Sequence, residues 1–154
     1  MSESLDKITK TQRSANMSKI RSNNTTPELF IRKALYIRNL RYRINYKDVS
    51  GTPDLYFTKN STAVFVNGCY WHRHENCKDA TTPKTNTEFW NKKFSENTCR
   101  DARIKAELMS SGIRILIIWE CTIKKMMKNQ NYREEMLDLI IQFIKDSEFN
   151  YLEI

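Results

Sequence analysis

The chain has 154 residues, of which 40% are apolar and 11% aromatic. This is enough to form the core of one domain and excludes general disorder. A formal net charge of +8 favours a polyanionic partner, although a merely solvated basic surface would give the same charge. No apolar run reaches the roughly 18 residues of a membrane span, and the N-terminus lacks a signal-peptide core. We therefore expect a cytoplasmic protein with no membrane partner.

The chain begins with a polar stretch that carries scattered lysines and arginines. Residues 1–24 are predicted to form a basic N-terminal arm, followed by a single domain over residues 25–154. Thr26-Pro27-Glu28 is typical of a helix start, with Thr26 as N-cap, proline in the first position and an acid in the first turn. Apolar residues at helical spacing continue this first helix to about Ile37.

Three strands are predicted next, at residues 41–45, 54–57 and 62–66. Two helices follow, TEFWNKKF at 87–94 and CRDARIKAELMSS at 99–111, and the second is expected to stop at Gly112. RILIIW at 114–119 has the length and branched residues of a buried strand, and a last amphipathic helix includes Met136 to Ile144. This order predicts an α/β fold with a restriction-endonuclease-like core, a mixed central sheet flanked by helices.

The stretch NGCYWHRHENC at 67–77 holds two of the four cysteines and both histidines. Cys121 follows strand 114–119 much as Cys69 follows strand 62–66, so parallel pairing of the two strands would bring both cysteines to one sheet edge. A structural zinc ion takes four thiolate or imidazole ligands. Cys77 and one histidine would complete the site, and the spacing leaves open whether His72 or His74 is that ligand. The alternative is that the cysteines are ordinary small buried residues.

One acidic residue and one missing pair of charges bear on catalysis. Asp54 follows Pro53 at the start of a predicted strand, where nucleases of this core hold Mg²⁺, often in a Pro-Asp pair. The next strand should then carry a Glu-x-Lys pair, but TAVFVNG has no charge. We therefore expect the histidine just beyond that strand to activate the attacking water, because imidazole exchanges protons near neutral pH.

Four motifs occur together in a characteristic order. Pro53-Asp54, FVNGCYWHRH, TEFW and RDARIKAELMSSGIRILIIWEC resemble the Vsr family of very-short-patch DNA mismatch endonucleases, from about Ser18 to Cys121. Two positions depart from the family pattern. Asn67 stands where the family often has a histidine, which weakens one expected contact to phosphate or the leaving group. The loop between His74 and Cys77 is one residue longer.

The resemblance implies a role for each candidate site residue. Asp54 would hold the catalytic Mg²⁺, together with the main-chain carbonyl of Val66. His72 would be the general base, and Asp101 would orient and charge-stabilise it. Glu28 would hold metal-bound waters. The structural zinc would be held by Cys69, His74, Cys77 and Cys121.

Three aromatic side chains are the remaining candidates. Tyr70, Trp71 and Trp90 would ordinarily be core residues. In the resembling family, aromatics at these positions enter the duplex beside a T·G mismatch, where opening a base step costs least. We therefore expect a monomer that nicks one strand of T·G-mismatched DNA by Mg²⁺-dependent hydrolysis and works with mismatch-repair proteins. The alternatives are a non-catalytic zinc DNA-binding module and a related nuclease without mismatch preference.

Overall fold

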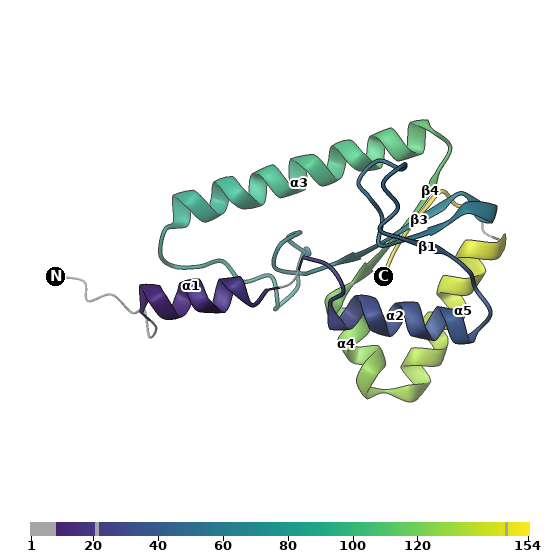
Figure 1. Ribbon diagram of the computed structural model, residues 1–154, viewed down its shortest axis with the longest axis horizontal. Coiled ribbons are helices and arrows are strands. Elements are labelled where there is room, and N and C mark those ends of the chain that lie inside the picture. The colour runs from purple at the N-terminus through teal and green to yellow at the C-terminus, as the bar shows by residue number, and fades with distance from the viewer. Residues whose placement is uncertain (1–8, 21, 147) are drawn as a thin grey trace.

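A computed structural model describes residues 9–20, 22–146 and 148–154. Its centre is a five-stranded mixed sheet with the strand order β1-β2-β3-β4-β5, flanked by helices on both faces (Figure 1). The short strands are β1 (Arg43–Ile44) and β2 (Leu55–Phe57), and the 3-10 turn η1 (Thr58–Asn60) follows β2. The two central strands are β3 (Thr62–Asn67) and β4 (Arg114–Trp119), and β5 (Tyr151–Glu153) lies at the far edge.

The pairing of β3 with β4 positions the site. These strands are parallel and in register from Thr62 opposite Arg114 to Asn67 opposite Trp119. β1, β2 and β3 pair antiparallel, whereas β5 joins β4 in parallel. Residues 62–66 and 114–119 therefore pair in parallel, which is the condition on which the predicted metal site depends. Because both strands end at the same edge, the segments that follow them start side by side.

Alternating side chains of β4 give the sheet two apolar faces. Leu116 and Ile118 belong to the larger core, which α2 (Thr26–Ile37), α4 (Glu120–Lys128) and α5 (Gln130–Asp146) cover. Ile115 packs with Leu108 in the smaller core beneath α3 (Thr87–Ser110), on the other face. Figure 1 shows α3 above the sheet and the three shorter helices below it. Residues from both faces can therefore meet at the edge where β3 and β4 end.

Helix α3 corrects one prediction and confirms another. Residues 87–94 and 99–111 are not two helices but parts of one helix of 24 residues. It ends at Ser110, and Gly112 follows with φ +73°, as the predicted stop at that glycine requires. The N-terminal half of α3 extends beyond the sheet toward α1 (Lys10–Ser18) (Figure 1).

Four other elements differ from the sequence-based expectation. The predicted arm contains α1, which buries none of its residues, and residues 1–8 and 21 of that arm lie outside the described part of the chain. Helix α2 has Thr25 as its N-cap in place of Thr26. Helix α4 and strand β5 were not predicted. Within the described residues, no helix combines the length and apolar character needed to cross a membrane.

Candidate functional site

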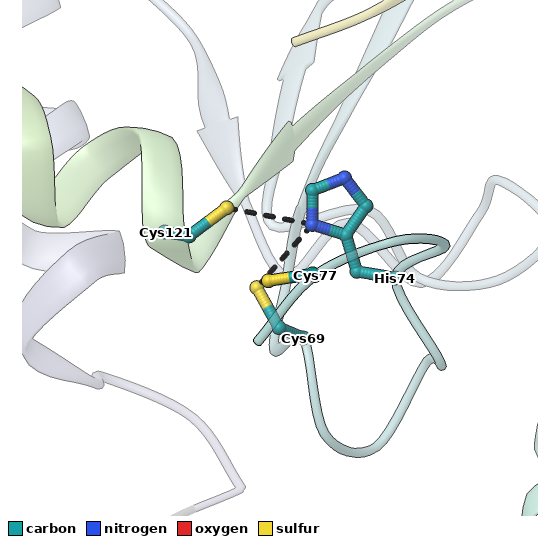
Figure 2. Close-up of side chains that lie close together, drawn as sticks. All are labelled: Cys69, His74, Cys77 and Cys121. Carbon is teal, nitrogen blue, oxygen red and sulfur yellow. Dashed lines mark hydrogen bonds between the residues drawn. The ribbon is translucent and has the colours of Figure 1, made fainter. Parts of the chain in front are cut away.

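Four soft ligands meet where β3 and β4 end. The ligand atoms of Cys69, His74, Cys77 and Cys121 all lie within 4.8 Å of one another. His74 Nδ1 is 3.4 Å from the Cys121 sulfur and 3.6 Å from the Cys69 sulfur (Figure 2). Three thiols and one imidazole are the donor set of a closed tetrahedral zinc site. Burial raises the pKa of the Cys69 thiol to about 12, so ionisation of this thiol calls for a bound cation.

The loop after β3 is folded by its own backbone. The His72 N–H donates to the Gly68 carbonyl at 3.1 Å, and the His74 N–H donates to the Cys69 carbonyl at 3.0 Å. Arg73 lies between the histidines with φ +54°, in the left-handed region. This reversal of the chain separates the two imidazoles, so that His74 faces the cysteines and His72 does not.

Arg73 also holds the segment that follows the cysteine cluster. Its guanidinium donates to the carbonyls of Ala80 and Thr81 at 3.0 and 2.9 Å, and to the Thr82 hydroxyl at 2.8 Å. The same group lies 4.1 Å from the ring centroid of Phe94 in α3. Sequence reasoning did not single out Arg73, because its partners are mostly main-chain carbonyls, which residue types do not reveal.

His74 is supported from behind by the end of the sheet. Its ring stacks on the indole of Trp119 with centroids 4.1 Å apart and planes 7° from parallel. The Trp119 indole N–H donates to Glu153 of β5 at 2.6 Å. The cluster is therefore linked through Trp119 to β4 and, through Glu153, to β5. Cys99 is exposed on α3 and is not part of the cluster.

His72 pairs with an acid from α3. Its Nδ1 lies 2.5 Å from the Asp101 carboxylate, and both side chains are partly buried. The main chain beside His72 is fixed as well, because the buried Asn97 side chain donates to the Trp71 carbonyl at 3.1 Å. A carboxylate on Nδ1 sets the tautomer of the imidazole and leaves Nε2 to accept a proton. An imidazole held in this way can act as a general base.

A cavity of about 460 Å³ lies beside this pair. Its lining includes Glu28, Val66, Trp71 and His72, as well as the basic Lys93. Acidic, basic and imidazole groups from α2, β3, α3 and the cysteine loop therefore converge on one space. Such a mixture suits a phosphate and its attacking water better than an apolar ligand.

Asp54 does not itself line this cavity, but it contacts a residue that does. Its carboxylate accepts a hydrogen bond from the Val66 N–H at 2.7 Å, and Val66 does line the cavity. Burial raises the pKa of Asp54 to about 6, and the Glu28 carboxylate adds to this rise. The Val66 N–H, the Arg32 guanidinium and His72 oppose it. A carboxyl group with a pKa so close to neutral pH is readily ionised when a cation binds beside it.

Glu28 is buried on the first turn of α2, with 5% of its surface exposed. Its carboxylate accepts hydrogen bonds from the Asn24 main chain at 2.8 Å and from Arg32 at 3.2 Å. Arg32 is a site-adjacent residue that sequence reasoning missed. The signal was present, because Arg32 stands four residues after Glu28, where helical side chains meet.

The three predicted wedge aromatics form one cluster. Tyr70 has ring centroids 5.1 Å from Trp71, 5.8 Å from Trp90 and 5.2 Å from Phe94. Tyr70, Trp71 and Trp90 are half-buried, whereas Phe94 is buried beneath them. Phe94 was not predicted, although its position four residues after Trp90 was an available signal. Trp71 lines the cavity that holds His72 and also two cavities shared with Met17 of α1.

The chain is similar in sequence to several known proteins. It is 38% identical over 142 residues to the type II nicking enzyme V.NmeAIP of Neisseria meningitidis, a match that covers 92% of this chain and 98% of the relative. It is 35% identical over 115 residues to the DNA mismatch endonuclease Vsr of Escherichia coli K12, covering 75% and 73% of the two chains. The family profile described as DNA mismatch endonuclease Vsr matches residues 5–79.

The chain belongs to the Vsr family. Another relative, the type II nicking enzyme V.XorIIP of Xanthomonas oryzae, is 36% identical over 118 residues, a match that covers 77% of this chain and 86% of the relative. The mixed sheet with helices on both faces is the restriction-endonuclease-like core expected for a Vsr protein. The match with V.NmeAIP spans more of the chain than the resemblance from Ser18 to Cys121 on which the sequence-based expectation was built.

Proposed function

We propose that this Vsr-family protein is a Mg²⁺-dependent DNA endonuclease that nicks one strand beside a T·G mismatch. One observation carries the catalytic part of the proposal. His72 bonds to Asp101 at 2.5 Å and lines the cavity that also holds Glu28 and Val66. Relatives named as nicking enzymes and as a DNA mismatch endonuclease support a strand-nicking hydrolase.

The protein's own groups suit hydrolysis of a phosphodiester by water. Asp101 holds Nδ1 of His72, so Nε2 takes the proton from a water that attacks the phosphorus in line with the leaving oxygen. As the proton arrives, the Asp101 carboxylate stabilises the imidazolium. Lys93, which lines the same cavity, adds positive charge beside the phosphate. These residues together activate the water and hold the reacting group.

The oxygen donors at the cavity fit a hard divalent cation. Glu28 supplies a carboxylate that lines the cavity from α2, and Val66 on β3 supplies a main-chain carbonyl. Asp54, the residue before β2, supplies a second carboxylate next to Val66. Magnesium prefers oxygen ligands and is held in proteins by one or two carboxylates. A bound Mg²⁺ would stabilise the negative charge that develops on the phosphate.

We assign the cluster of Cys69, His74, Cys77 and Cys121 to a structural zinc ion. Its sulfur and nitrogen donors differ from the oxygen donors at the cavity, so the two sites favour different metals. The loop that joins them carries ligands and wedge aromatics as close neighbours in sequence. A zinc ion on Cys69 and His74 would therefore fix the positions of Tyr70, Trp71 and His72.

The aromatic cluster is the proposed reader of the mismatch. Trp71 lines both the catalytic cavity and the cavities beside α1, so it lies between the hydrolytic groups and the aromatic surface. Insertion beside a mismatch costs less than opening a paired step, and each stacked base returns about 1–3 kcal/mol. Selectivity would then arise from the difference in unstacking cost.

Catalysis and mere binding are separated by one comparison. An end-labelled duplex with a single T·G pair is incubated with wild-type protein, with and without Mg²⁺, and with Asp54→Ala. We expect a single nick with wild-type protein and Mg²⁺ only, while Asp54→Ala binds the duplex without nicking it. Binding by wild-type protein without any nick would instead favour a non-catalytic zinc DNA-binding module.

A further inference from the structure

Two opposite charges are buried together at the start of α2. Glu28 is 5% exposed and Arg32 is 8% exposed, and Arg32 Nη2 lies 3.2 Å from Glu28 Oε2. Removing both charges from water is costly, so buried pairs are weak contributors to stability. In the described part of the chain, Arg32 Nε is also the one buried side-chain nitrogen or oxygen without a hydrogen-bond partner. Stability alone therefore gives a poor account of this pair.

Asn24 closes the pair into a ring of three residues. Its side-chain oxygen accepts from Arg32 Nη1 at 2.7 Å, and its main-chain N–H donates to Glu28 Oε2 at 2.8 Å. Asn24 has φ +53°, a left-handed conformation that asparagine tolerates better than most residues. The Arg32 carbonyl accepts from the Tyr42 hydroxyl at 2.7 Å, which anchors the helix at this point.

The ring orients the Glu28 carboxylate. Both donors, from Asn24 and Arg32, contact Oε2. Oε1 is therefore the oxygen left for a ligand in the cavity that Glu28 lines. Arg32 also opposes the repulsion between the Glu28 and Asp54 carboxylates, since it attracts the charge that Glu28 repels. The Arg32 guanidinium thus fixes the Glu28 carboxylate and reduces the electrostatic effect of Glu28 on Asp54.

We propose that Arg32 is a positioning residue for the cation site, holding Glu28 by Oε2, with help from Asn24, so that Oε1 serves the metal or its waters. The inference rests on the proposed Mg²⁺-dependent nicking. Lysine cannot replace arginine here without loss, because one ammonium does not present the two-nitrogen fork that spans Asn24 and Glu28. The expected order of cation affinity is therefore arginine, lysine, glutamine.

The test measures cation binding directly, apart from activity. Mn²⁺, a spectroscopic stand-in for Mg²⁺, is titrated into the zinc-loaded full chain, and bound Mn²⁺ is followed by its paramagnetic signal. Arg32→Gln should weaken Mn²⁺ binding about 10–100-fold, the usual effect of losing a group that orients a metal ligand. Arg32→Lys should fall between. The matched control is Arg38→Gln, at the C-cap of the same helix, because Arg38 pairs with Glu134 away from the cavity.

A milder variant keeps the inference testable if Arg32→Gln fails to fold. Asn24→Gly keeps the left-handed backbone and the N–H to Glu28 and removes only the oxygen that holds Arg32, so a smaller loss is expected. Wild-type Mn²⁺ affinity in both Arg32→Gln and Asn24→Gly, or in Asn24→Gly alone when Arg32→Gln is unfolded, would overturn the inference. Wild-type protein that nicks DNA without a divalent cation would overturn the proposed function instead.

Discussion

His72 and Asp101 come from separate segments, the loop after β3 and the middle of α3, yet their side chains meet at 2.5 Å. His72→Ala should abolish nicking, because a positioned general base contributes about 10²- to 10⁴-fold to the rate. Asp101→Asn should give a partial loss, since the imidazole is kept but less well oriented. Single-turnover nicking measures both effects, and a binding isotherm serves as the control. Substantial nicking by His72→Ala would place the base elsewhere.

Asp54 gives the metal-free protein a dependence of stability on pH. Its pKa rises from 3.8 to about 6 on folding, so the unfolded chain loses this proton first as pH increases. Stability should therefore fall between about pH 4 and pH 6, by at most about 3 kcal/mol. Asp54→Asn removes this loss and can still accept from the Val66 N–H.

Melting curves of wild type and Asp54→Asn in a chelator-free, Mg²⁺-free buffer provide the measurement. We expect the two proteins to melt alike near pH 4 and the variant to be more stable at pH 7. Added Mg²⁺ should narrow the difference at pH 7 by stabilising the wild-type carboxylate. If the stability difference between wild type and variant is the same at both pH values, the pKa of Asp54 is not raised on folding.

From the sequence, site residues could be placed together where their positions depend on the ends of strands. Cys69 and Cys121 could be assigned to one metal site because each follows a strand, and parallel strands end at one edge of the sheet. Partners within the loop were out of reach, since Arg73 bonds to main-chain carbonyls that any residue supplies. The left-handed turn at Arg73 decides which of His72 and His74 faces the cysteines. This turn contains no glycine by which the sequence would indicate it.

Whole elements were missed where they are short or polar, or where no turn residue marks their start. Helix α1 buries no residue and contains few apolar side chains, and β5 has only three residues. Helix α3 was divided because residues 95–98, Ser-Glu-Asn-Thr, include no apolar side chain; the buried residues of α3 are Phe94, Asn97 and Leu108. Helix α4 begins directly after β4 at Glu120, with no turn residue to mark the change.

The loop and α3 together present the aromatic cluster, which gives the third prediction. Trp71→Ala should lose about 1–3 kcal/mol of affinity for T·G duplex, roughly 5- to 150-fold, and little for paired duplex. Tyr36→Ala, at an exposed tyrosine on α2, is the control and should leave both affinities unchanged. Binding isotherms on the two duplexes and a melting curve measure the effects. A less stable Trp71→Ala with intact preference would make Trp71 a core residue.

At the scale of the molecule, the cysteine cluster joins the end of β3, the start of α4 and the loop between β3 and α3. Zinc should therefore stabilise the whole fold, because a closed zinc site contributes folding free energy. Cys121→Ser, or chelation, should lower both the melting temperature and activity. Cys99→Ser, an exposed cysteine outside the cluster, should change neither. Metal analysis of wild-type protein that finds far less than about one zinc per chain would refute the ligand assignment.

Mismatch-directed nicking is tested most directly on a panel of end-labelled duplexes that differ only in one base pair. The panel holds T·G, the other mismatches and the fully paired duplex, and single-turnover rates are measured with Mg²⁺ present. We predict that one strand of the T·G duplex is nicked beside the mismatch much faster than any strand of the paired duplex. Equal rates on T·G and paired DNA would contradict the account and favour a related nuclease without mismatch preference.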